Sequence, residues 1–174
     1  MFGSYVRCGI CRIEFKIMLK IIGLGSELRG DDRIGPEIIK SLRKMELDLP
    51  VKLYNVGSDA FSIIEHLIGE EPVLIVDCAK MGKKPGSVQK LNIDEVNLHV
   101  VDRSLSLHGM SFAEAYRLAK SMGKVAPCSL IAIEPEQVNF NVPLSDIVRK
   151  KIPEIIKMVL EEAKANAEQK NLNH

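Results

Sequence analysis

Short apolar runs alternate with helical patterns along most of this chain, and this alternation restricts the fold more than any other feature of the sequence. Each run has the length of a strand and ends at glycine, acidic or turn-forming residues. The predicted strands are residues 19–25, 51–57, 72–79, 87–93 and 128–136. The predicted helices begin near Pro36, at Ser58 or Asp59, at Ser111 and at Ser145. Helices between mostly parallel strands predict an α/β fold of three layers, with a twisted sheet between two layers of helices.

Two of these elements differ from the others. Residues 87–93 alternate polar with apolar side chains, which is more typical of an edge strand than of a central one. The long amphipathic stretch from Ser145 to about Gln169 contains Pro153, which should kink or interrupt a helix. Residues 72–79, in contrast, are a near-continuous apolar run, so we expect them at the centre of the sheet.

Composition and charge narrow the class of protein. The chain has 174 residues, of which 46% are hydrophobic and 27% charged, as in one soluble globular domain. A formal net charge of +1 gives no basic surface for nucleic acid or an anionic membrane. No apolar run approaches the roughly 20 residues that cross a bilayer. We expect a cytoplasmic monomer that binds neither nucleic acid nor membrane.

The first 17 residues, MFGSYVRCGICRIEFKI, have no unbroken apolar core of the kind that a secretory signal needs. Cys8 and Cys11 have the spacing of half a zinc site or of a redox pair, but no second such pair exists in the chain. No role is assigned to them. The predicted domain is residues 18–174, preceded by a leader that supplies neither a strand nor a ligand.

A glycine-rich loop, GLGSELRGDDRIGPEII at residues 23–39, follows the first predicted strand. Such loops usually hold phosphate, yet Asp31 and Asp32 would repel it. A dinucleotide site would need glycine where Leu28 stands, and no Lys-Ser or Lys-Thr pair completes a phosphate-binding P-loop. The loop is therefore predicted to contact a cation, or a partner that brings one. Its predicted substrate-contacting residues are Gly23, Gly25, Gly30 and Asp31.

Three predicted loops at one edge of the sheet each offer a side chain that binds metals. Asp32 follows the first strand, Asp77 ends the third, and His108 precedes the helix at Ser111. In doubly wound folds such ends meet near the point where the strand order reverses. Two carboxylates and an imidazole suit nickel, zinc, iron or manganese.

Each acidic residue also has a structural explanation. Asp31 is better explained as a cap of the first helix, whereas for Asp32 capping and metal binding stay open. Asp77 could be a turn residue, and Glu134 is best explained as part of a solvated turn.

No Ser-His-Asp or Cys-His nucleophile is evident. Cys78 adjoins Asp77, but strand side chains alternate between faces, which predicts that its thiol points away. Cys78→Ala is therefore expected to preserve activity. Hydrolysis would then use water that a metal or a carboxylate activates.

Four blocks in order, GLGSELRGDDRIGPEII, VLIVDCAKMGKKPG, SLSLHGMSFAEAYRLA and IAIEPE, resemble the hydrogenase maturation endopeptidases over residues 19–160. The resemblance implies a five-stranded sheet with one antiparallel strand. It also implies cleavage of a C-terminal extension from the large-subunit precursor of a nickel–iron hydrogenase after nickel insertion. Asp32, Asp77 and His108 would recognise the nickel as catalytic and metal-binding residues. The precursor would bring that nickel, and the resting enzyme would hold no metal of its own or an adventitious divalent ion.

The sequence departs from the pattern of this family in two places, because Ser26 stands where the family usually has Asn and Arg33 where Gly is common. Both departures bear on substrate preference. An alternative class is the magnesium-dependent phosphoacceptor receiver domain, which also places an acidic pair after its first strand and an aspartate at the end of its third. Its acidic pair follows the strand directly, however, and its last strand ends in lysine.

Because residues 1–17 supply neither a strand nor a ligand, a chain that begins at Met18 should fold and process its substrate like the full chain. Circular dichroism and a cleavage assay on both chains would measure this. An unfolded or inactive shorter chain would contradict it.

Overall fold

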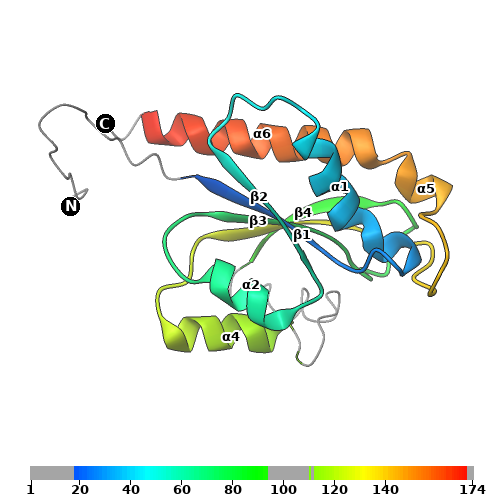
Figure 1. The fold of residues 1–174 in the computed structure, drawn as a ribbon, viewed down its shortest axis with the longest axis horizontal. Helices are drawn as coiled ribbons and strands as arrows, with labels where there is room; N and C mark the ends of the chain where they lie inside the picture. Colours follow the sequence, from blue (N-terminus) through cyan, green and yellow to red (C-terminus); the bar gives the residue numbers. More distant parts are fainter. Residues whose placement is uncertain (1–17, 94–109, 111, 172–174) are drawn as a thin grey trace, which may run out of the picture.

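The computed structural model describes residues 18–93, 110 and 112–171 and contains one mixed sheet between helices (Figure 1). Its strands are β1 (Leu19–Leu24), β2 (Val51–Gly57), β3 (Val73–Cys78), β4 (Val88–Ile93) and β5 (Cys128–Ile133). Their order in the sheet is β2-β1-β3-β5-β4. Neighbours pair in parallel, except that β4 runs antiparallel to β5 at one edge. The predicted five-stranded, mostly parallel sheet is confirmed, including the edge position of residues 88–93.

The helices cover both faces of this sheet. They are the 3-10 helix η1 (Gly30–Arg33), α1 (Ile34–Arg43), α2 (Ala60–Leu67), α4 (Phe112–Met122), α5 (Asp146–Arg149) and α6 (Ile152–Asn171). In Figure 1, α1, α5 and α6 lie on one side of the strands, and α2 and α4 lie on the other. The three-layer prediction is therefore correct. Among the described helices, none combines the length and the apolar character that crossing a membrane requires.

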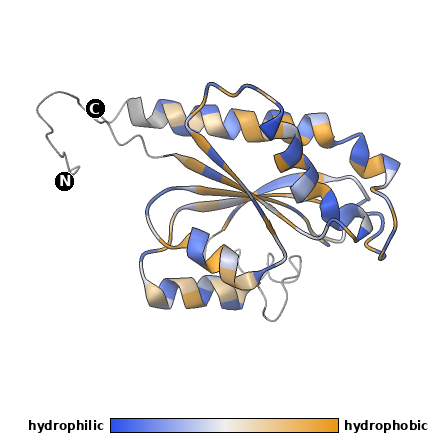
Figure 2. Ribbon diagram, viewed as in Figure 1, coloured by the Kyte–Doolittle hydropathy of each residue, from blue (hydrophilic) through white to orange (hydrophobic). Residues whose placement is uncertain are grey.

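Alternating side chains of β3 supply both halves of the core. Val73 and Ile75 pack in the cluster that includes residues of α2 and α4, whereas Leu74 and Val76 pack with residues of α1 and α6. All four are buried because β3 lies between β1 and β5 and has helices above and below. Figure 2 shows hydrophilic and hydrophobic residues interleaved along the helices, the pattern of amphipathic helices that cover a sheet.

Local signals in the sequence set several helix boundaries. Asp59 caps α2, because its carboxylate accepts hydrogen bonds from the backbone amides of Phe61 at 3.3 Å and Ser62 at 3.1 Å. The predicted C-terminal helix is interrupted between α5 and α6, and Pro153 lies in the first turn of α6, where proline is tolerated. The predicted cap at Ser111 lies outside the described residues.

The strand order changes direction at the carboxyl ends of β1 and β3. From β1 the chain crosses through α1 to β2 at one edge, whereas from β3 it continues to β4 at the other edge. The loops that leave these two adjacent strands therefore run in opposite directions. Doubly wound folds bind ligands in the gap between such loops. The expected central position of the third strand is confirmed.

Close backbone packing fixes α1 against this end of the sheet. A Cβ atom added to Gly35 would lie 2.1 Å from the backbone oxygen of Leu24 and 2.5 Å from that of Val76. Gly23 makes the reciprocal contact, since its added Cβ would lie 2.5 Å from the backbone oxygen of Gly35. Only glycine allows the first turn of α1 to touch both β1 and β3.

Gly35→Ala should therefore destabilise the protein by about 2–3 kcal/mol, the range of overpacking a dense core. Chemical denaturation monitored by circular dichroism would measure the change. Gly123→Ala is the matched control, because the nearest atom to its added Cβ, from Ile68, lies at an ordinary 3.6 Å. The prediction fails if both variants unfold at the same denaturant concentration.

Candidate functional site

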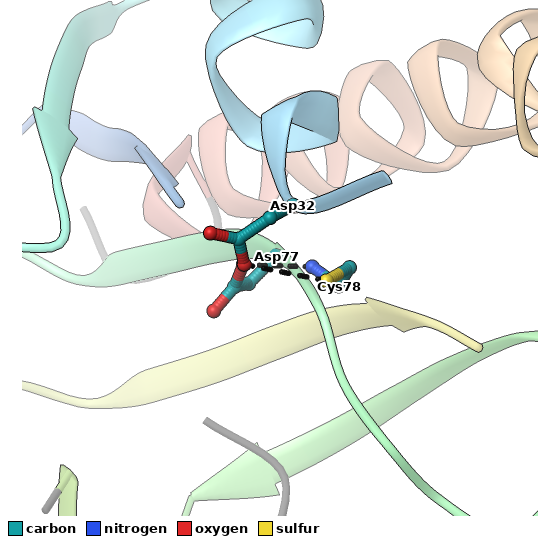
Figure 3. Close-up of side chains that lie close together, drawn as sticks. All are labelled: Asp32, Asp77 and Cys78. Atoms are coloured by element: carbon teal, nitrogen blue, oxygen red, sulfur yellow. Dashed lines mark hydrogen bonds between the residues drawn. The ribbon is translucent and has the colours of Figure 1, made fainter. Parts of the chain in front are cut away.

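Asp32 and Asp77 meet at the carboxyl ends of β1 and β3. Asp77 is the penultimate residue of β3 and is 4% exposed, whereas Asp32 lies in η1 and is half-buried. One ligand atom from each of Asp32, Asp77 and Cys78 lies within 4.8 Å of the other two. Figure 3 shows the two carboxylates facing each other from η1 and the end of β3. The expected approach of Asp32 and Asp77 is therefore observed, while His108 lies outside the described residues.

Gly25 lets the loop pass directly between these two residues. Its φ is +109°, and an added Cβ would lie 1.8 Å from the backbone oxygen of Asp32 and 3.3 Å from Oδ1 of Asp77. The backbone amide of Ser26 donates a hydrogen bond of 3.0 Å to Oδ2 of Asp32. The backbone amide of Asp32 donates to the Arg29 backbone oxygen at 2.9 Å. The loop thus holds the Asp32 carboxylate in place over β3.

Asp31 is fully buried, and its carboxylate binds protein rather than a ligand. It accepts hydrogen bonds from the backbone amides of Glu136, Gln137 and Ser145 at 2.7–3.0 Å, and from the Ser145 hydroxyl at 3.0 Å. Asp31 has a structural role, as expected, but it does not cap the first helix. It secures the segment after β5 and the start of α5, whereas α1 has no side-chain cap.

Gly30 belongs to the same attachment. Its φ is +46°, and an added Cβ would lie 2.6 Å from the backbone oxygen of Gln137. Gly25 and Gly30 thus both have positive φ, and in both cases the close neighbour is the protein's own backbone.

The sequence predicted that the thiol of Cys78 points away from Asp77, but it did not predict that the thiol lies beside Asp32. Its Sγ lies 3.5 Å from Oδ1 of Asp32, and its backbone amide donates a hydrogen bond of 2.7 Å to Oδ1 of Asp77 (Figure 3). Side chains of β3 do alternate between faces, and Cys78 packs on the α1 side with Val76. However, Asp32 extends over the end of the strand, so carboxylate and thiol meet there. The thiol therefore belongs to the site.

The site is electrostatically unfavourable to its own negative charges. Burial raises the pKa of Asp77 well above its usual range, the Asp32 carboxylate raises it further, and the hydrogen bond from Cys78 opposes the rise. The pKa of the Cys78 thiol is also raised, first by burial and then by Asp77 and Asp32. A divalent cation between the carboxylates would favour their ionised forms. The arrangement can hold such an ion or position water beside a carboxylate.

Glu134 is not the solvated turn residue that the sequence suggested. It is 7% exposed and its Oε2 accepts hydrogen bonds from the backbone amides of Met81 at 2.7 Å and Lys83 at 3.1 Å. It therefore holds the loop that follows β3. Its place at the end of a buried strand was the available signal, but the sequence does not show which amides return to that edge.

Arg33 lies beside the site with its side chain turned to the loop. Its Nη2 donates to the backbone oxygen of Glu27, and its buried Nε has no hydrogen-bond partner in the described part of the chain. The Glu27 side chain in turn accepts a hydrogen bond from Asn55 of β2. The arginine that departs from the family pattern thus contacts the loop between β1 and η1.

The receiver-domain alternative does not fit this sheet. Receiver domains have the flavodoxin-like strand order 2-1-3-4-5. Here β5 lies between β3 and β4, and β4 runs antiparallel to it. The difference in strand order removes that alternative.

Comparisons with known proteins identify the family and agree with the fold. The sequence profile of the hydrogenase maturation protease family matches residues 36–162, a segment that contains Asp77 and His108 and begins just after Asp32. The coenzyme F420 hydrogenase subunit delta of Methanothermobacter thermautotrophicus is 26% identical over 157 residues, which are 82% of this chain and 92% of that protein.

Solved structures show the same fold. The hydrogenase maturating endopeptidase HybD of Escherichia coli superposes with a TM-score of 0.74 at 20% identity, over 85% of this chain and 93% of that one. The nickel–iron hydrogenase maturation protease HybD of Thermococcus kodakarensis superposes with a TM-score of 0.67 at 25% identity, over 84% and 99%. With the profile covering most of the described residues, the chain belongs to the hydrogenase maturation protease family.

Proposed function

We propose that this protein is the endopeptidase that removes the C-terminal extension of a nickel–iron hydrogenase large-subunit precursor once nickel has been inserted. The observation that carries the proposal is the buried Asp77 carboxylate beside Asp32 at the carboxyl ends of β1 and β3. Membership of the hydrogenase maturation protease family supports a peptidase acting on such a precursor. One relative is itself named as a hydrogenase subunit, which also supports a hydrogenase partner.

The nickel is part of the substrate. Burial and the neighbouring Asp32 carboxylate disfavour the ionised form of Asp77, and the metal ion of the precursor would supply a compensating charge. His108 completes the set that the family resemblance implies. Docking of the nickel would place the peptide bond that follows it beside the carboxylates, and a precursor without nickel would lack this attraction.

Hydrolysis then needs water and two proton transfers. A water oxygen attacks the carbonyl carbon, the carbon–nitrogen bond breaks, and the departing amine gains a proton. Either a carboxylate takes the proton of the attacking water as general base, or the nickel lowers the pKa of that water. Asp32 is the better placed of the two carboxylates for the first role, because it is half-buried while Asp77 is enclosed.

The remaining parts of the proposal follow from the same docking. The resting enzyme needs no metal of its own, and the partner is the precursor alone. We propose that the enzyme acts as a cytoplasmic monomer.

Asp32→Asn, Asp77→Asn and His108→Ala should each reduce processing by at least about 100-fold, the lower end of the contribution of a positioned acid–base group. Cleavage of nickel-loaded precursor, followed by the change in mass of the large subunit, would measure this. The matched control is Asp48→Asn, which removes an exposed carboxylate from the loop before β2. Wild-type processing by all three site variants would contradict the assignment.

Asp77→Asn should not destabilise the protein at neutral pH. Because the pKa of Asp77 is raised in the folded state, its ionisation costs folding free energy, and wild-type stability falls as pH rises from about 4 through that pKa. The asparagine removes this loss. Thermal melts should show an equal or higher Tm for the variant at pH 7, with the difference shrinking toward pH 4. A lower Tm at pH 7 would count against the raised pKa.

Processing should depend on the nickel of the substrate. Nickel-loaded precursor should be cleaved, and nickel-free precursor should be cleaved at least about 100-fold more slowly, because the charge that docks it is missing. Binding of each precursor to the enzyme, measured in parallel, separates failed docking from failed chemistry. Equal cleavage of both precursors would overturn the role of nickel.

A further inference from the structure

Cys78 is placed like a metal ligand, although the proposed hydrolysis does not use it. It ends β3 directly after Asp77, is 6% exposed, and its Sγ lies 3.5 Å from Oδ1 of Asp32. Its Sγ and one oxygen from each carboxylate lie within 4.8 Å of one another (Figure 3). We propose that Cys78 is a further protein ligand of the site beside Asp32 and Asp77, so that this chain binds a soft divalent ion such as nickel through sulfur as well as oxygen.

The distances suit one ion. With metal–sulfur bonds of about 2.3 Å and metal–oxygen bonds of about 2.0 Å, two tetrahedral ligands lie about 3.5 Å apart. The separation between Sγ of Cys78 and Oδ1 of Asp32 is 3.5 Å. The other two pairs of ligand atoms, each of which includes an Asp77 oxygen, lie at most 4.8 Å apart. Rotation of the side chains can shorten such a distance to the value that one ion requires.

Asp77 gives a second, independent indication that a ligand belongs here. Its side chain is 4% exposed, and the one hydrogen bond that it accepts from described residues comes from the backbone amide of Cys78 to Oδ1. Among the residues that the structure describes, none donates to Oδ2. Among the described residues, the fully buried side-chain nitrogen or oxygen without a partner is Nε of Arg33, so Oδ2 of Asp77 is not fully enclosed and is open to a cation.

Cys78 would bind the ion as a thiolate, whose negative charge a divalent cation beside it stabilises. On binding, the sulfur–hydrogen bond breaks, the sulfur–metal bond forms with the same electron pair, and the proton leaves to solvent. No oxidant or reductant takes part.

The inference rests on the proposed function only for the source of the nickel. A sulfur ligand predicts a preference for Ni²⁺ or Cd²⁺ over Mg²⁺, since thiolates select soft ions and carboxylates alone do not. It also replaces the earlier expectation that Cys78→Ala preserves activity, which assumed a thiol that points away from Asp77.

The test is a titration of the purified full chain with Ni²⁺, monitored by thiolate-to-nickel charge-transfer absorption and by calorimetry. Every protein carries Cys8→Ser and Cys11→Ser, which removes the one closely spaced cysteine pair of the chain. Cys78→Ala and Cys78→Ser are compared with Cys128→Ala, which removes a second buried thiol from β5. Circular dichroism checks folding.

The parent and Cys128→Ala should show the absorption band. Both Cys78 variants should lack it and bind Ni²⁺ at least about 10-fold more weakly, as losses in metal sites commonly do. A band that persists in folded Cys78→Ala, or a parent without a band at millimolar Ni²⁺, would overturn the assignment. Cleavage of nickel-loaded precursor by the parent is measured separately. A band without cleavage would support Cys78 as a ligand and reject the proposed function. Cleavage without a band would support the proposed function and reject Cys78 as a ligand.

Discussion

The carboxylate of Asp31 receives hydrogen bonds from three backbone amides and one hydroxyl, and the geometry of the site depends on this buried junction. Hydrogen bonds to a charged group contribute about 1.5–3 kcal/mol each. They join η1 to the segment that follows β5, more than 100 positions later in the chain. Asp32, the next residue, is thereby held over the end of β3. A structural aspartate thus positions beside it the aspartate that we propose to be functional.

The site itself is arranged against the stability of the fold. The Asp77 carboxylate is buried, accepts a hydrogen bond from the backbone amide of Cys78 and lies close to the Asp32 carboxylate. The thiol of Cys78 lies near both carboxylates. A core built for stability alone would carry apolar side chains at the end of β3, as β5 does with Ala132 and Ile133. The acidic pair is unfavourable in the free protein, and in our proposal the cation of the substrate offsets this cost and thereby selects the substrate.

Much of the fold was predictable because it follows from periodicity. Residues 51–57 form a strand with the predicted bounds, and Asp59 caps the helix that follows. The approach of Asp32 and Asp77 was also predictable, since the ends of adjacent parallel strands share one edge. The contacts of Asp31 and Glu134 were not, because a sequence does not show which distant amides reach a carboxylate. The closeness of the Cys78 thiol to Asp32 was missed. The alternation of side chains along β3 does not show that Asp32 extends over the end of the strand.

The insertion of β5 between β3 and β4 has a consequence for synthesis of the chain. Among the described residues, β4 pairs with no strand except β5, and β3 keeps one side open until β5 joins it. During translation, residues 88–93 therefore leave the ribosome well before residues 128–133, which must enter between two strands already made. Contacts across such a sequence separation form slowly. Until then β3 is an uncovered apolar edge, the kind of surface that chaperones bind.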